Sequence, residues 1–181
     1  PAPDSAPAPI AATSSGGVAL DSAAMKMRAG VVVVASSEGR GTGFLADTAR
    51  GSGLIVTSTT LVPADSVVDI QLDGSTRVRG RVAASDRGAG VAVVAVALQP
   101  WSGYRVLPVG GDSAIKGGDS LLALGAGVAP KRGAAKASDD GKAARPAVTI
   151  SRADAGRPVI SASSSVVAVA TQKGGQSTFA M

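Results

Sequence analysis

The 181 residues include no cysteine and no histidine, and aromatic side chains are limited to Phe44, Trp101, Tyr104 and Phe179. The lack of cysteine excludes a disulfide framework, a thiolate zinc site and a cysteine nucleophile. The lack of histidine removes the usual general base and the commonest metal ligand. Four aromatic residues are too few for a platform that stacks bases or sugars. No apolar run reaches 18 residues, so the sequence predicts no membrane-spanning helix.

A hydrophobic fraction of 45% nevertheless predicts a folded core, and the length favours a single domain. Residues 1–17 (PAPDSAPAPIAATSSGG) are nearly all Pro, Ala, Ser and Gly and are expected to form an extended tether. A terminus of this kind is typical of a processed, exported protein, although no leader is present in the sequence. Residues 18–27 show a weak helical pattern of apolar side chains, with Asp21 or Ser22 as the expected N-cap.

The remainder is predicted to be all-β, because short Val/Ile/Leu-rich runs alternate with Gly-rich turns. The expected strands are residues 30–35, 43–45, 54–57, 67–72, 76–83, 91–97, 120–124, 147–150, 158–160 and 166–170. Residues 39–43 (GRGTG) are expected to be a hairpin turn, because a strand rather than a helix follows them. Residues 100–104 (PWSGY) are expected to be a surface turn, and residues 125–146 a mobile basic loop.

Two small clusters have the residue types of chemical sites. Ser113 and Lys116 have the spacing of a Ser-x-x-Lys acyl-enzyme dyad, but their Gly-flanked surroundings favour a turn. Asp139 and Asp140 are the only adjacent carboxylates and are more typical of a loop than of a metal site. No cofactor and no metal is expected.

Three arginines, Arg77, Arg79 and Arg81, alternate with small or apolar residues, which places their side chains on one face of a strand. The simplest interpretation is a solvated barrel face, and the alternative is a surface that binds carboxylates or phosphates. Residues 131–157, which include Arg157, add seven basic against three acidic side chains, and the whole chain carries a formal charge of +5. Acidic proteins, anionic polymers or anionic lipids are therefore suitable partners, whereas no nucleic-acid module is recognisable.

Seven segments follow one another in a recognisable order. They are residues 28–34 (RAGVVVV), 41–57 (with GTGFL and GLIVT), 67–82 (with VVDIQLDG), 86–94 (DRGAGVAVV), 107–125 (with GDS and GDSLLALG), 154–159 (DAGRPV) and 174–181 (GGQSTFAM). Their order and spacing resemble trypsin-like proteases of the HtrA/Deg family over residues 19–181. The resemblance implies two six-stranded β-barrels of the chymotrypsin fold that divide near residues 98–106, and a PDZ module that would follow Met181.

The resemblance also places the catalytic triad, and all three of its positions are replaced. Thr60 stands at the histidine position, Gly90 at the aspartate and Ala155 at the nucleophilic serine. The oxyanion donors would be the N–H groups of Ala153 and Ala155, and Arg157 replaces a glycine of the nucleophile turn. Because no imidazole exists anywhere in the chain, no shift of register restores a Ser-His-Asp triad.

The expected function is therefore that of a catalytically inactive pseudoprotease, a structural or protein-binding subunit of a periplasmic cell-envelope assembly. The alternative is a periplasmic module that binds an anionic polymer or peptide through Arg77, Arg79, Arg81 and Arg157. Residual hydrolysis at a Ser-Lys or threonine site is a third hypothesis.

Overall fold

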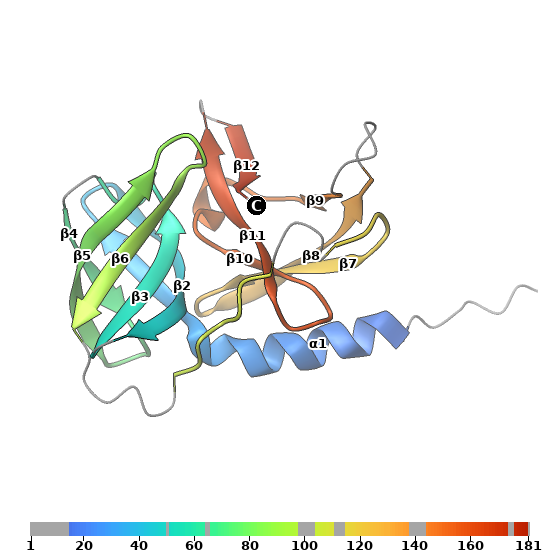
Figure 1. Ribbon diagram of the computed structural model, residues 1–181, viewed down its shortest axis with the longest axis horizontal. Helices are drawn as coiled ribbons and strands as arrows, with labels where there is room; N and C mark the ends of the chain where they lie inside the picture. The colour runs from blue at the N-terminus through green and yellow to red at the C-terminus, as the bar shows by residue number, and fades with distance from the viewer. Residues whose placement is uncertain are drawn as a thin grey trace, which may run out of the picture.

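Two six-stranded β-structures lie side by side with one α-helix beneath them (Figure 1). The computed structural model describes residues 15–49, 51–63, 66–97, 104–110, 115–137, 144–173 and 176–180. The first structure is a closed barrel with strand order β1-β2-β3-β6-β5-β4. Its strands are β1 (Val31–Ser36), β2 (Gly39–Ala49), β3 (Ser52–Ser58), β4 (Val67–Gln71), β5 (Arg77–Asp86) and β6 (Val91–Ala97).

The second structure is a six-stranded sheet, nearly closed into a barrel, with strand order β12-β11-β10-β7-β8-β9. Its strands are β7 (Ser120–Gly125), β8 (Val128–Lys136), β9 (Arg145–Val148), β10 (Pro158–Ile160), β11 (Val166–Lys173) and β12 (Gln176–Ala180). The all-β prediction with two six-stranded barrels and a short N-terminal helix is confirmed. The predicted division near residues 98–106 falls largely outside the described residues.

Period-two burial explains why these segments form a barrel. Ala92, Val94 and Val96 of β6 alternate with half-buried neighbours, and each is at most 1% exposed. They pack against Ile55 and Ile70 inside the first barrel. Alternation of this kind buries one face of each strand and leaves the other face available for surface contacts.

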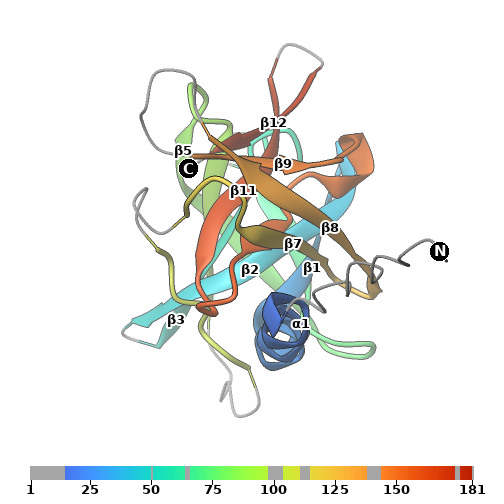
Figure 2. The same cartoon turned by 90° about the vertical axis from the view of Figure 1, so that its right-hand side faces the viewer.

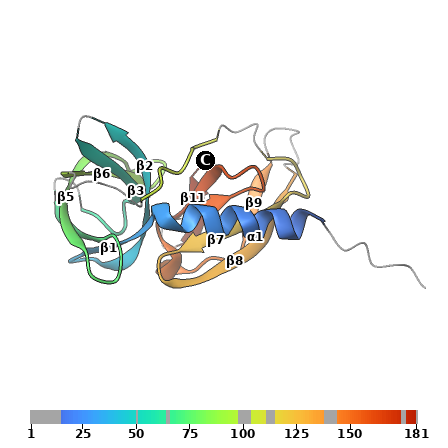
Figure 3. The ribbon, with the colours of Figure 1, turned by 90° about the horizontal axis from the view of Figure 1, so that it is seen from below.

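Helix α1 (Ser15–Met27) joins the two halves. Leu20, Ala23, Ala24 and Met27 follow helical spacing and are buried in one cluster with Phe44 of β2 and apolar residues of β7 and β10. Figures 2 and 3 show the helix end-on and lengthwise, lying against β7 of the second sheet. The chain then passes through the 3-10 turn η1 (Arg28–Gly30) directly into β1.

The helix differs from its prediction in two respects. It begins at Ser15 rather than at residue 18, so Asp21 and Ser22 lie inside it and do not cap it. Val18 and Met25, which had been counted in the apolar pattern, are 76% and 77% exposed. The buried face uses two alanines instead, because small side chains allow the helix to approach β7 closely. Residues 1–14 of the predicted tether lie outside the described residues.

Two loop predictions were wrong. The predicted basic loop at 125–146 contains the whole of β8 and the first residues of β9. Residues 39–43, predicted as a turn, begin β2, and Gly41 pairs with Val34 of β1. The turn itself lies at Ser37 and Glu38. Residues 100–103, Ser113 and the Asp139-Asp140 pair lie outside the described part of the chain. Within the described part, no helix has the length and apolar character that a membrane span requires.

Candidate functional site

The predicted triad positions lie on three turns at the junction of the two barrels. The turn after β3 carries Thr60, and the N–H of Thr59 donates to the Gly90 oxygen at 2.9 Å. The second barrel contributes Ala155, whose oxygen accepts from the N–H of Thr42 at 3.1 Å. The structure therefore brings the turns of Thr60 and Gly90 into direct contact and fixes the Ala155 turn against β2.

At the first position the Thr60 side chain is exposed, and its hydroxyl lies 2.9 Å from the Ser58 hydroxyl. A pair of hydroxyl groups offers no base near neutral pH, because neither oxygen takes up a proton there. The neighbouring Leu61 turns inward and packs in one apolar cluster with Ala155. This turn thus supplies packing rather than proton transfer.

The second position, Gly90, has no side chain, and its φ of +78° lies in the left-handed region. An added Cβ would lie 3.1 Å from the Thr171 Cβ of β11. The hydroxyl of Thr171 is buried and has no hydrogen-bond partner among the described residues. Gly90, which has no side chain, offers this hydroxyl no side-chain acceptor.

The third position, Ala155, is 2% exposed and follows the 3-10 turn η3 (Arg152–Asp154). Its N–H donates back to the Arg152 oxygen at 3.3 Å. An oxyanion site needs two N–H groups that converge on one external oxygen. The prediction that Ala153 and Ala155 would supply these donors therefore fails at Ala155, whose N–H is already used inside the turn.

Gly156 allows the turn to approach β2 closely. A Cβ at this position would lie 1.8 Å from the Thr42 oxygen and 2.6 Å from the Thr57 hydroxyl, and φ is +80°. The Thr57 hydroxyl donates to the same Thr42 oxygen at 2.8 Å. The N–H of Gly156 donates to the Ala170 oxygen of β11 at 2.7 Å, which anchors the turn on its second side.

A cluster of three charges fixes the far side of this turn. The buried Asp154 carboxylate has Lys131 Nζ at 2.6 Å and Arg157 Nε at 3.0 Å. Arg157 also donates through Nη1 to the Ala129 oxygen at 3.2 Å. Burial by itself would raise the pKa of Asp154, but hydrogen bonds from Lys131 and Ser151 and the charge of Arg157 outweigh it and lower that pKa. The Asp154 carboxylate therefore stays ionised and holds the turn in its present form.

A sequence model of the trypsin-like peptidase domain matches residues 41–177. The chain belongs to this family. The matched residues run from β2 to β12 and include Thr60, Gly90 and Ala155. No curated protein matches the chain.

The arginine row of this trypsin-like domain, defined as Arg77, Arg79 and Arg81, lies on the outer face of β5. All three side chains are exposed, whereas Gly80 and Val82 between and beyond them are buried. None of the three forms an ion pair within the described part of the chain, where Asp69 of β4, opposite Arg79, is the acidic neighbour in the sheet. Arg157 was predicted to act with this row, but it lies apart from it, buried and paired with Asp154.

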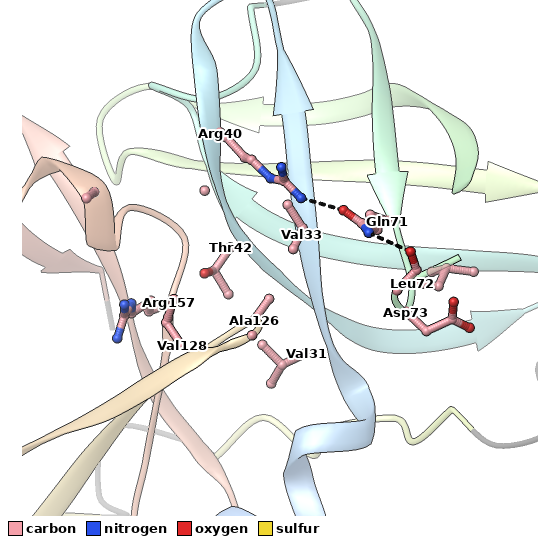
Figure 4. A pocket seen from close by; sticks show the side chains of 14 residues that line it. Val31, Val33, Arg40, Thr42, Gln71, Leu72, Asp73, Ala126, Val128 and Arg157 are labelled. Carbon is pink, nitrogen blue, oxygen red and sulfur yellow. Dashed lines mark hydrogen bonds between the residues drawn. The ribbon is translucent and has the colours of Figure 1, made fainter. Parts of the chain in front are cut away.

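A groove of about 660 Å³ lies between Arg157 and residues 71–73 (Figure 4). Val31, Val33 and Ala126 lie between Arg157 on one side and Gln71 and Asp73 on the other. Arg40 donates to the Gln71 side chain across the outer end of the groove. This groove and the role of Arg40 have no signal in the sequence, since both depend on how β1, β2 and the β7–β8 turn are placed in space.

The Asp73 end of the groove is a tight polar turn. The Asp73 carboxylate accepts from the N–H groups of Ser75 and Thr76 at 2.8 and 2.7 Å and from the Tyr104 hydroxyl at 2.8 Å. These hydrogen bonds hold the pKa of Asp73 well below its usual range. Burial and the Asp73 contact raise the pKa of Tyr104, so the hydroxyl keeps its proton and remains a donor. Asp73 is thus a fixed negative charge.

Proposed function

We propose that this trypsin-like domain is a catalytically inactive, HtrA-like pseudoprotease that serves as a protein-binding subunit of a periplasmic cell-envelope assembly. The observation that carries the proposal is the absence of histidine from the whole sequence, and Thr60, Gly90 and Ala155 stand at the positions that the resemblance assigns to the triad. A hydroxyl attacks a peptide only when a neighbouring base accepts its proton, and the chain has no imidazole to do so.

The geometry of the Ala155 turn supports the same conclusion independently of the triad. The Ala155 N–H is occupied by the Arg152 oxygen, and Leu61 and Ala155 fill the junction with apolar atoms. Stabilisation of a developing oxyanion requires free, preorganised donors, and loss of one such donor alone costs about 10²–10³ in rate. The proposed inactivity therefore has two causes: no imidazole accepts the proton of an attacking hydroxyl, and the Ala155 N–H does not stabilise an oxyanion.

The assignment to the HtrA branch and to the periplasm rests on the order of the sequence motifs and on the Pro/Ala-rich terminus. The binding role rests on what the chain retains. Both barrels have buried hydrophobic cores, and such a fold can present a binding surface without catalysing a reaction.

Two measurements test the proposal. The purified chain is incubated with a fluorophosphonate probe and with a fluorescent protein substrate, with trypsin as the positive control. We expect neither labelling nor turnover, and a stoichiometric adduct at Thr60 or Ser113 would overturn the proposal. Native purification from the envelope fraction is expected to retain a companion protein in fixed stoichiometry. Recovery of the chain alone, at low and at physiological salt, would contradict a role as an assembly subunit.

A second candidate function is a binding module for an anionic polymer, and the unpaired arginine row favours it. Attraction between exposed charges is screened beyond about 8–10 Å at physiological ionic strength. A polymer-binding module would therefore lose its ligand steeply as salt is raised, whereas an apolar protein interface would not.

A further inference from the structure

We propose that the groove and the arginine row form one site for a single extended segment of a partner protein. A short apolar stretch of the segment occupies the groove, and acidic residues at alternate positions lie along Arg77, Arg79 and Arg81. This inference rests on the proposed binding function and specifies the chemistry of the partner.

The groove suits a chain of small apolar side chains. Val31, Val33, Leu72, Ala126 and Val128 supply most of its apolar lining. Val128 is 51% exposed at the edge of the groove, although it is apolar. A partner that covers these side chains removes apolar surface from water, which is the main source of affinity in such contacts.

The groove adjoins the arginine face along a shared rim, where Arg40 is hydrogen-bonded to Gln71. A shallow pit of about 90 Å³ shares Val33, Arg40 and Gln71 with the groove and adds Asp69 and Arg77. The strand register explains this continuity, because Val33 of β1 pairs with Gln71 of β4, which pairs in turn with Arg77 of β5. A segment that leaves the groove over Val33 therefore reaches Arg77 directly.

The arginine row has the spacing of an extended peptide. Alternate residues of a strand are about 7 Å apart, so a second extended chain presents its own alternate side chains at the same interval. A guanidinium group binds a carboxylate through two parallel hydrogen bonds. Arg77, Arg79 and Arg81 have no ion-pair partner in the described part of the chain, so their donors are available to such a segment.

Two acidic groups border the row and limit where acidic residues of the segment can lie. Asp73 is a fixed negative charge in the β4–β5 turn, four residues before Arg77, and is held by its own turn and Tyr104. It disfavours an acidic residue at the edge of the groove beside it. Asp69 faces Arg79 across the β4–β5 pair and competes weakly for it. Arg40 and the three arginines of the row outnumber Asp69 on this face.

The test uses a fluorescein-labelled peptide with four Val and Ala residues followed by three glutamates at alternate positions. Its binding is measured by fluorescence anisotropy at low and physiological salt. Replacement of the whole row (Arg77→Gln, Arg79→Gln, Arg81→Gln) is expected to weaken binding roughly ten-fold, from about 0.5 kcal/mol for each exposed pair. The control replaces three other exposed arginines, Arg87, Arg105 and Arg145, which removes the same charge and is expected to leave binding within two-fold.

The groove is tested separately with Val128→Asp, an exposed position that tolerates a polar side chain. Its added charge is expected to weaken binding of the peptide and not that of inorganic polyphosphate. A scrambled peptide of the same composition is expected to bind more weakly than the ordered one. Equal binding of both peptides, or equal losses in the two arginine variants, would overturn the proposal, and preference for polyphosphate would favour the polymer module. None of these outcomes bears on the absence of hydrolysis, which the fluorophosphonate experiment tests independently.

Discussion

Arg157 and Asp154 form a buried ion pair across a single turn, with Nε of the arginine 3.0 Å from Oδ1 of the carboxylate. The two side chains are 8% and 2% exposed, and Lys131 approaches the same carboxylate from β8. The charge of this arginine is thus balanced inside the protein.

Asp154→Asn is expected to lower the free energy of unfolding by about 3–5 kcal/mol, because it leaves the buried Arg157 guanidinium without a counter-charge. Asp21→Asn is the matched control. Asp21 pairs with Arg132 on the surface, where both side chains are more than half exposed, so its loss should cost less than about 1 kcal/mol. Urea denaturation measures both values, and similar costs would contradict the buried-pair account.

Acid is expected to weaken the fold through the same group. The folded-state pKa of Asp154 is lowered, so its contribution is complete above the unfolded value of about 3.9 and is lost as pH falls through the lower folded value. The difference in unfolding free energy between the native chain and Asp154→Asn should therefore be constant from pH 7 to 5 and shrink below pH 4. If this difference in unfolding free energy grew as the pH fell, the pKa of Asp154 would be raised by folding and not lowered.

Two buried threonines should respond in opposite ways to replacement by valine. Thr171 lies beside Gly90 with an unsatisfied hydroxyl, so Thr171→Val is expected to stabilise the chain by about 1 kcal/mol. Thr57 donates to the Thr42 oxygen at 2.8 Å, so Thr57→Val is expected to destabilise it by a similar amount. Thermal unfolding of the two variants provides the comparison, and a stabilising Thr57→Val would refute this assignment of hydrogen bonds.

Restoring the triad residues alone is not expected to restore hydrolysis. In the variant Thr60→His, Gly90→Asp, Ala155→Ser, the N–H of residue 155 still bonds to the Arg152 oxygen, and position 90 retains a left-handed φ. We expect no fluorophosphonate labelling above that of the native chain. Efficient labelling would mean that the turn rearranges readily and that only the side chains were missing.

Most strands were predictable because their composition agrees with their burial. The Val-rich runs at residues 31–34 and 166–170 are mostly buried, and the run at 91–97 is buried at every second position, as a strand with one inner face requires. Strand β8 (Val128–Lys136) was missed because its Gly, Ala, Lys and Arg residues have weak β-propensity and only Ala135 is buried. Its pairing with β7 and β9 overrides local preference.

The site was predictable only in its parts. Thr60, Gly90, Ala155 and the arginine row were identified from local motifs and from period two. Lys131 could not be assigned to Asp154 while β8 was taken for a loop, because the two residues meet only after the second sheet has formed. The groove joins β1, β2, the segment after β4 and the β7–β8 turn, and no pattern within one segment encodes that arrangement.

Helix α1 has a mechanical consequence. Its last residue leads through η1 into β1 of the first barrel, while its buried face is seated on β7 of the second. A force applied at Ser15 must first separate the buried side chains of the helix from their apolar cluster on the second sheet, before it reaches β1. These side chains are Leu20, Ala23, Ala24 and Met27. The helix would thus protect the closed barrel, and the arginine row on it, from tension applied at Ser15.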